Sequence, residues 1–196
     1  MGIIESANHG SHCTAGSWGF RCPVNPTAIR ETEMNELQES IFEALKILIE
    51  VDKDLIKTQP KEECINHKLA QYLEAVLNKM NLLGTCSVDI EYNKYKEDEK
   101  KKSNGRNIRP DIIAHERKSG NNNNLIVIEA KKNYDTTEDR EKVVDLVDSR
   151  DYQYSVGAVI SFFPQREYLK IKFYAEGKWR RYLMNKNDFA ITETKR

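Results

Sequence analysis

The sequence predicts one α/β domain in which helices flank a mixed sheet. Two stretches with apolar residues three and four positions apart come first, and three short segments with strand character follow them. A third helical stretch then precedes another strand and a hairpin. The 196 residues are enough for one compact domain with a modest extra segment. We expect residues 1–58 to form an irregular segment plus an amphipathic helix, and residues 59–196 to form the main domain.

The two predicted N-terminal helices run from about Glu31 to Glu50 and from about Lys61 to Met80. Pro60 separates them, and Gly84 is a natural stop after the second. Each has one apolar stripe, formed by Met34, Leu37, Ile41, Leu45 and Leu48 in the first and by Ile65, Leu69, Leu73, Val76 and Leu77 in the second. Residues 1 to about 28 contain glycine and proline without an apolar period and are expected to be irregular.

Glu62 continues the apolar stripe of the second helix. It lies three residues before Ile65 and seven before Leu69, and residues at these spacings share a helix face. Glu63 is turned about 100° away from that face. We therefore expect Glu62 to point inward. Acidic residues are also favoured in the first turn of a helix because they interact with the positive end of its dipole, so this position alone does not require a role in a site.

Three strands are predicted next. Residues 86–93 alternate between apolar and polar side chains, with Cys86, Val88, Ile90 and Tyr92 on the apolar side. A charged loop separates them from two short apolar segments, residues 108–115 and 125–132. Because "RKSGNNNN" between these segments is turn material, they are predicted to form a hairpin.

A hairpin symmetric about Gly120 brings acidic residues together. Asp111 and Glu129 each lie nine residues from that centre, so they face each other across the two strands. Lys131 is two residues from Glu129 and shares its face. This arrangement depends on the register, because a bulge or a slip of one residue would separate the three side chains.

The rest of the chain is predicted as a helix, a strand and a hairpin. Residues 136–149 form the helix, with Thr136 or Thr137 as its cap, and residues 155–163 form a buried strand that Pro164 ends. The last hairpin is expected to turn at Glu176-Gly177.

The charge distribution favours a protein that meets a polyanion on one side. The formal net charge is zero, but residues 94–109 hold seven basic and three acidic residues, whereas residues 29–63 hold five basic and ten acidic. Solvated loops and helix faces would produce the same counts. The longest apolar run, "VGAVISFF", is too short to cross a bilayer, and no secretory signal is recognised, so a cytoplasmic protein with reduced cysteines is expected.

Two acids and an amine inside apolar segments indicate a metal and a phosphate. Asp111 and Glu129 a few ångströms apart would repel, and one would hold a proton unless a cation lay between them. Carboxylate oxygens with a backbone carbonyl are ligands that Mg²⁺ and Mn²⁺ prefer. A water bound to such an ion can attack a phosphodiester, and the Lys131 ammonium suits a role in holding that water or the phosphate.

At these residues the sequence resembles the PD-(D/E)XK nuclease superfamily, which has the restriction-endonuclease-like fold. Pro110 and Asp111 match the first half of its motif, and Glu129, Ala130 and Lys131 match the second. The resemblance covers about residues 61–163 and implies an αβββαβ core, with an extra N-terminal helix and a C-terminal hairpin outside it. It implies that Asp111, Glu129 and the carbonyl of Ala130 bind Mg²⁺ or Mn²⁺, that Lys131 is the catalytic lysine, and that Glu62 is an accessory acid.

The resemblance implies a metal-dependent nuclease, with DNA favoured over RNA only because DNA is the usual substrate of the superfamily. A catalytically inactive domain that binds nucleic acid or protein is the alternative. A homodimer or a protein partner bound through the helix Glu31–Glu50 is a third hypothesis. A zinc site at His9, His12, Cys13 and Cys22 is weaker, because their spacing matches no standard zinc finger.

Overall fold

The computed structural model describes residues 26–58, 60–95, 98–101, 105, 107–117 and 123–195. Within these ranges four helices and nine strands follow one another along the chain. In order, they are α1 (Pro26–Val51), α2 (Lys53–Thr58), α3 (Glu62–Lys79), β1 (Ser87–Ile90), β2 (Lys94–Tyr95), β3 (Asp98–Glu99), β4 (Ile112–His115), β5 (Asn124–Lys131), α4 (Thr137–Asp148), β6 (Val156–Phe162), β7 (Tyr168–Ala175), β8 (Lys178–Asn185) and β9 (Ile191–Glu193). The candidate zinc residues between His9 and Cys22 lie outside these ranges.

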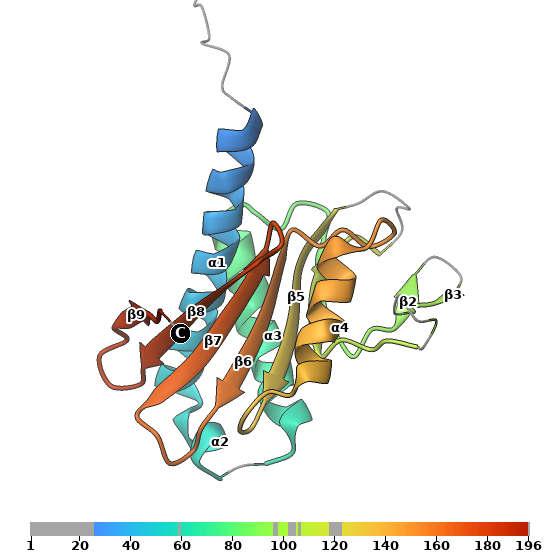
Figure 1. Ribbon diagram of the computed structural model, residues 1–196. Helices are drawn as coiled ribbons and strands as arrows, with labels where there is room; N and C mark the ends of the chain where they lie inside the picture. The colour runs from blue at the N-terminus through green and yellow to red at the C-terminus, as the bar shows by residue number, and fades with distance from the viewer. Residues whose placement is uncertain are drawn as a thin grey trace, which may run out of the picture.

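A seven-stranded open sheet forms the centre of the molecule, in the order β1-β4-β5-β6-β7-β8-β9 (Figure 1). Only β5 and β6 are parallel, and α4 connects them; the other neighbours in this sheet are antiparallel. The expected mixed α/β architecture is therefore present. β2 and β3 form a separate two-stranded ribbon inside the predicted charged loop.

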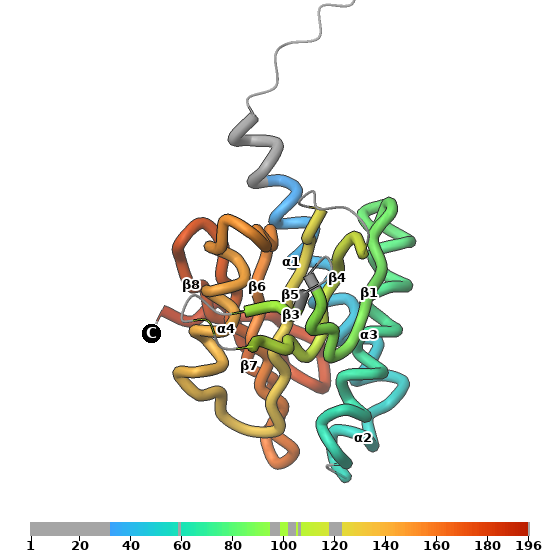
Figure 2. Tube along the Cα trace, turned by 90° about the vertical axis from the view of Figure 1, so that its right-hand side faces the viewer, coloured from blue at the N-terminus to red at the C-terminus, as the bar shows by residue number. Residues whose placement is uncertain are grey.

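The sheet is covered on both faces, by α1 and α3 on one side and by α4 on the other (Figure 2). Successive side chains of β5 alternate between these two layers, as the geometry of a strand requires. Ile126, Ile128 and Ala130 belong to the core cluster that contains residues of α1 and α3, whereas Val127 packs with Leu146 of α4. Glu129 and Lys131 lie two and four residues after Val127 on β5, so their side chains are on the same face of the strand as Val127 and face α4.

The helix α1 begins at Pro26, five residues before the predicted start at Glu31. Proline is compatible with the first turn of a helix, because its missing N–H has no intrahelical acceptor there. The apolar stripe of α1 is buried from Leu37 to Ile49 and shares one core cluster with α3 and the sheet. A partner bound through α1 remains a prediction. No helix of the described residues is sufficiently long and apolar to span a membrane.

The register of the β4–β5 hairpin is confirmed. Ile112 pairs with Ile128 and Ile113 with Val127, so the hairpin is symmetric about position 120 as expected. The strand β4 is shorter than predicted, since it begins at Ile112 instead of Ile108. A register shift follows Ala114, at the end of the hairpin far from Asp111.

The first predicted strand is also shorter than its alternating pattern. It ends at Ile90, which is 37% exposed instead of buried. Glu91 adopts φ +51°, outside the extended region, and so ends the strand. The C-terminal hairpin is confirmed: Glu176 and Gly177 have φ values of +50° and +72°, as a tight two-residue hairpin turn requires. The strand β9 was not predicted.

Candidate active site

The predicted site residues come together at one edge of the sheet. Asp111 lies directly before β4, and Glu129 and Lys131 lie at the end of β5. The N-terminal ends of α3 and α4 meet the same edge, at the bottom of Figure 1. Ligands of open α/β sheets commonly bind beside the carboxyl ends of parallel strands, which is where β5 and β6 end.

Asp111 is held against the peptide between Glu129 and Ala130. Its Oδ2 accepts a hydrogen bond of 2.8 Å from the N–H of Ala130. Continuing the register of β4 and β5 by one residue places Asp111 opposite Glu129, as the symmetric hairpin predicts. The Asp111 side chain is 18% exposed, so solvent reaches it.

Lys131 lies among three carboxylates. Its Nζ is 3.6 Å from Asp111 Oδ2, 3.7 Å from Glu129 Oε2 and 3.4 Å from Asp139 Oδ1. Burial alone would lower the pKa of Lys131, but attraction by these acids outweighs it and raises the pKa above its ordinary value. Lys131 is therefore a permanent cation at neutral pH and does not act as a base there.

Glu129 is fully buried, with an exposed fraction of 0%. Its Oε2 lies 2.6 Å from Lys142 Nζ, while its Oε1 has no hydrogen-bond partner among the described residues. Burial, and then repulsion by Asp111, raise the pKa of Glu129 to about 7 in spite of the nearby ammonium groups. This carboxyl group consequently needs either a proton or a further cation.

Glu62 occupies the inward position predicted for it. From the first residue of α3, its Oε1 accepts a hydrogen bond of 3.1 Å from the N–H of Lys132. The contact ties the start of α3 to the end of β5. The negative charge of Glu62 is also near enough to contribute to the raised pKa of Lys131.

Sequence reasoning missed Asp139 and Lys142, both on α4. Asp139 caps the helix together with Thr136 and also faces Lys131, and these contacts lower its pKa although burial alone would raise it. Both residues lie on the stripe of Val143 and Leu146: Asp139 is four and seven residues before them, and Lys142 is four before Leu146. The step that placed Glu62 inward would have found both.

Carboxylates gather at this end of the sheet. In the contacts of the described residues, Asp111, Glu129 and Asp139 lie within ion-pair distance of Lys131, Lys142 pairs with Glu129, and Glu62 also attracts Lys131. A divalent cation between Asp111 and Glu129 would reduce the repulsion of their carboxylates, and the unpartnered Oε1 of Glu129 would be a ligand for it.

The oxygen atoms that could bind a metal here are few, but they are compatible with Mg²⁺. Among the described residues, no group of three or more His, Cys, Asp or Glu is arranged to hold a metal ion. The ligands expected from the sequence are two carboxylates and the carbonyl of Ala130. Mg²⁺ is commonly bound by one or two carboxylates and keeps several waters, so this set fits it.

His115, at the end of β4 away from Asp111, belongs to another cluster. His115 Nε2 lies 3.0 Å from Asp89 Oδ2, and Arg117 also pairs with Asp89. His115 is buried and packs against the ring of Tyr92 at 4.6 Å between centroids. It is a hydrogen-bonded core histidine.

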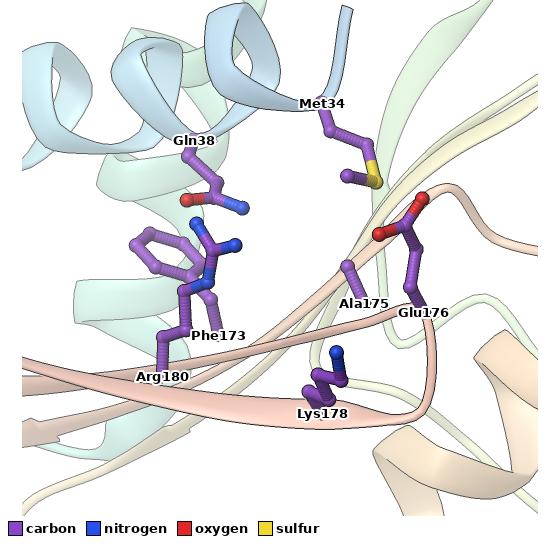
Figure 3. Close-up of a pocket in the computed structure, with 7 residues that line it drawn as sticks. All are labelled: Met34, Gln38, Phe173, Ala175, Glu176, Lys178 and Arg180. Carbon is purple, nitrogen blue, oxygen red and sulfur yellow. The ribbon is translucent and has the colours of Figure 1, made fainter. Parts of the chain in front are cut away.

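Two pockets of the molecule lie away from the candidate site. One, of about 40 Å³, lies between α1 and the β7–β8 hairpin, where Met34 and Gln38 face Phe173 and Arg180 (Figure 3). A wider cleft of about 850 Å³ includes Asn123 and Leu125, at the opposite end of β5 from Lys131. Neither pocket is lined by Asp111, Glu129 or Lys131.

No model of a known protein family matches this chain, and no curated protein matches it.

Proposed function

We propose that the protein is a metal-dependent nuclease that hydrolyses phosphodiester bonds. The observation that carries the proposal is the convergence of Asp111, Glu129 and Lys131, with Lys131 Nζ within 3.7 Å of both carboxylates. These are the residues that the PD-(D/E)XK motif pairs with a divalent ion and a phosphate. The unpartnered Oε1 of the buried Glu129 supports the same proposal, because it is a free ligand atom.

In this proposal each residue has one task. Asp111, Glu129 and the carbonyl of Ala130 hold Mg²⁺ or Mn²⁺, which when bound supplies an activated water and neutralises charge on the phosphate. Lys131 stays protonated and binds the attacking water or a phosphate oxygen. Glu62 and Asp139 position the end of β5 and the Lys131 ammonium, respectively.

The order of elements supports a restriction-endonuclease-like core. The sequence α3, β1, β4, β5, α4, β6 follows the αβββαβ order that the resemblance implies, with the ribbon β2–β3 inserted between β1 and β4. In that assignment Asp111 lies beside the second core strand and Glu129 and Lys131 lie on the third. DNA is preferred over RNA as substrate only through the resemblance.

A cleavage assay tests the proposal. The full chain is incubated with single- and double-stranded DNA and RNA in Mg²⁺, in Mn²⁺ or with a chelator. We expect cleavage only with metal, and its loss in Lys131→Ala. Lys178→Ala is a matched control, because it removes an exposed lysine from the face of the sheet that α1 covers. Cleavage that persists in the chelator or in Lys131→Ala would reject the proposed chemistry.

One observation favours a second candidate, a catalytically inactive domain of the same type that binds nucleic acid or protein. Lys142 Nζ already lies 2.6 Å from Glu129 Oε2, so part of the charge that a metal would balance is balanced by the protein. Nucleic acid bound without cleavage in any divalent metal would support this candidate over the first.

A further inference from the structure

Tyr134 is unusual in its exposure. Among the described residues that expose a large apolar side chain, it is the one aromatic residue, with 61% of its surface accessible. It lies in the turn between β5 and α4, three residues after Lys131. A single exposed apolar side chain is ordinary on a protein surface, so the surroundings of this ring decide whether it can bind something.

The ring is held in place by its neighbours. Tyr134 meets Phe163 edge to face, with ring centroids 5.0 Å apart and planes at 62°. The guanidinium of Arg166 donates hydrogen bonds to the hydroxyls of Tyr134 and Tyr168 and lies 5.2 Å from the centroid of the Tyr134 ring. A ring fixed in this way loses little conformational entropy when a ligand stacks on it.

The turn itself is anchored. Asp135, the next residue, accepts hydrogen bonds of 2.7 and 2.6 Å from Lys172 and pairs with Arg140 of α4. The Cα atoms of Lys131 and Tyr134 are separated by three residues, hence by at most about 11 Å. The backbone of Tyr134 is thus held close to that of the candidate catalytic lysine.

Basic side chains stand on the same face of the sheet. Lys131 pairs with Ser161, and Ser161 pairs with Lys170, so Lys131 and Lys170 point to one face from β5 and β7. Two strand spacings separate them, which is about 10 Å. Lys170 has no ion pair with any other residue of the described ranges, so its ammonium is available to a phosphate.

We propose that Tyr134 stacks on an unpaired nucleobase next to the scissile phosphate, and that Lys170 contacts the neighbouring backbone. The substrate is then single-stranded or locally unpaired nucleic acid. In an intact duplex both faces of an internal base are covered by its neighbours, so an exposed ring beside the site has nothing to stack on. This inference rests on the proposed function, because it assigns the substrate of the same site.

Binding without metal tests the inference separately from catalysis. Fluorescence anisotropy with the full chain in a chelator compares a labelled single-stranded oligonucleotide with a blunt-ended, fully paired duplex that contains the same strand. Tyr134→Ala is expected to weaken single-strand binding roughly 5- to 150-fold, as loss of one base–aromatic stack does, and to leave duplex binding unchanged. Tyr134→Phe keeps the ring and loses the hydrogen bond from Arg166, so it is expected to bind far more tightly than Tyr134→Ala and close to the wild type.

Two further variants sharpen the test. Tyr134→Leu keeps an apolar side chain without a stacking face and is expected to bind as weakly as Tyr134→Ala. Lys170→Ala is expected to lower the salt dependence of single-strand binding by about 0.7 in the logarithmic slope, the value for one phosphate contact. Thermal unfolding of each variant shows whether it is folded.

The outcomes separate this inference from the nuclease proposal. Metal-dependent cleavage with single-strand binding that does not change in Tyr134→Ala would overturn the inference alone. A wild-type protein that binds the duplex more tightly than the single strand would also overturn it. Single-strand binding that depends on Tyr134 in a protein that never cleaves would uphold the stacking site and reject the nuclease.

Discussion

Glu129 lies fully buried, with one oxygen against Lys142 and the other without a partner among the residues described. A buried carboxylate costs free energy unless its charge is balanced. Lys142 supplies part of the balance from α4, and in our proposal a divalent ion supplies the rest. The chemistry of the site therefore depends on how this single carboxyl group is compensated, and two residue-scale predictions follow from it.

Lys142→Ala is expected to lower the free energy of unfolding by about 3 kcal/mol at pH 8, because it leaves a buried anion without its closest cation. Mg²⁺ is expected to restore part of the loss, since a ligand that binds only the folded state stabilises it. Urea unfolding with and without Mg²⁺ measures both effects. In a Glu129→Gln background the same substitution is expected to cost much less; an equal cost there would contradict the pairing.

The raised pKa of Glu129 predicts a pH dependence of stability in the presence of a chelator. The folded state keeps the Glu129 proton up to about pH 7, whereas the unfolded chain loses it near the ordinary value of 4.5. Stability from this group is therefore full below pH 4.5 and is lost as the pH rises to 7, by about 3 kcal/mol in all. The lowered pKa of buried His115 acts in the opposite direction, so the measurement needs a reference.

That reference is Glu129→Gln, which carries no titrating group at this position and leaves His115 unchanged. The difference in unfolding free energy between wild type and Glu129→Gln, measured by urea titration at pH 5 and pH 8, is expected to fall as the pH rises. A difference that is the same at both values would show that Glu129 is not buried in the way the structure indicates.

At the scale of elements, the position of α4 on the sheet depends on Gly157 in β6. A Cβ atom at this residue would lie 2.3 Å from Val143 Cγ1 and 2.9 Å from Val147 Cγ2, so α4 packs against the strand where a side chain would be. The helix carries Asp139 and Lys142, and its cap at Thr136 uses the same Asp139 carboxylate that faces Lys131. A shift of α4 on the sheet would therefore also move Asp139 and Lys142 in the candidate site.

Gly157→Ala is expected to push α4 from the sheet and to destabilise the protein by about 1–3 kcal/mol. Cleavage is expected to fall at temperatures where the variant is still folded, because Asp139 and Lys142 move away from their partners. Adding Val143→Ala removes the closest contact and should recover part of both losses. Unchanged melting temperature and activity in Gly157→Ala would contradict this packing.

The β4–β5 hairpin, α4 and β1 show what the sequence could and could not predict. The hairpin register followed from two apolar segments around one turn, and Ile112 pairs with Ile128 as expected. The spacing of residues 136–149 predicts a helix but not that Asp139 and Lys142 meet the end of β5, although both positions lie on the stripe of Val143 and Leu146. The strand end at Ile90 was missed because alternation continues past it, while the backbone of Glu91 turns away.

At the scale of the whole molecule, α1 is part of the main core. Its buried side chains include Leu37, Ile41, Leu45, Leu48 and Ile49, in one cluster with α3 and the sheet. Each such side chain contributes about 1.5–3 kcal/mol when it is removed from water, so together they approach the total stability of a typical domain. The periodicity of residues 31–50 predicted the stripe but not the surface that covers it.

Deletion of residues 1–58 is therefore expected to leave a protein that does not fold, since the apolar surface of α3 and the sheet becomes exposed. Deletion of residues 1–31 removes none of these side chains and is expected to melt close to the full chain. Circular dichroism and thermal unfolding of the two truncations check this. A cooperative transition in the shorter protein would show instead that α1 is an accessory helix.

The central claim is that Asp111 and Glu129 share a divalent ion, and calorimetric titration with Mn²⁺ tests it most directly. At pH 8 we predict binding to the full chain, weakened about tenfold or more in Asp111→Asn and in Glu129→Gln. Glu138→Gln, at an exposed position of α4, is predicted to bind like the wild type. Absence of Mn²⁺ binding, or equal binding by all three variants, would contradict the claim.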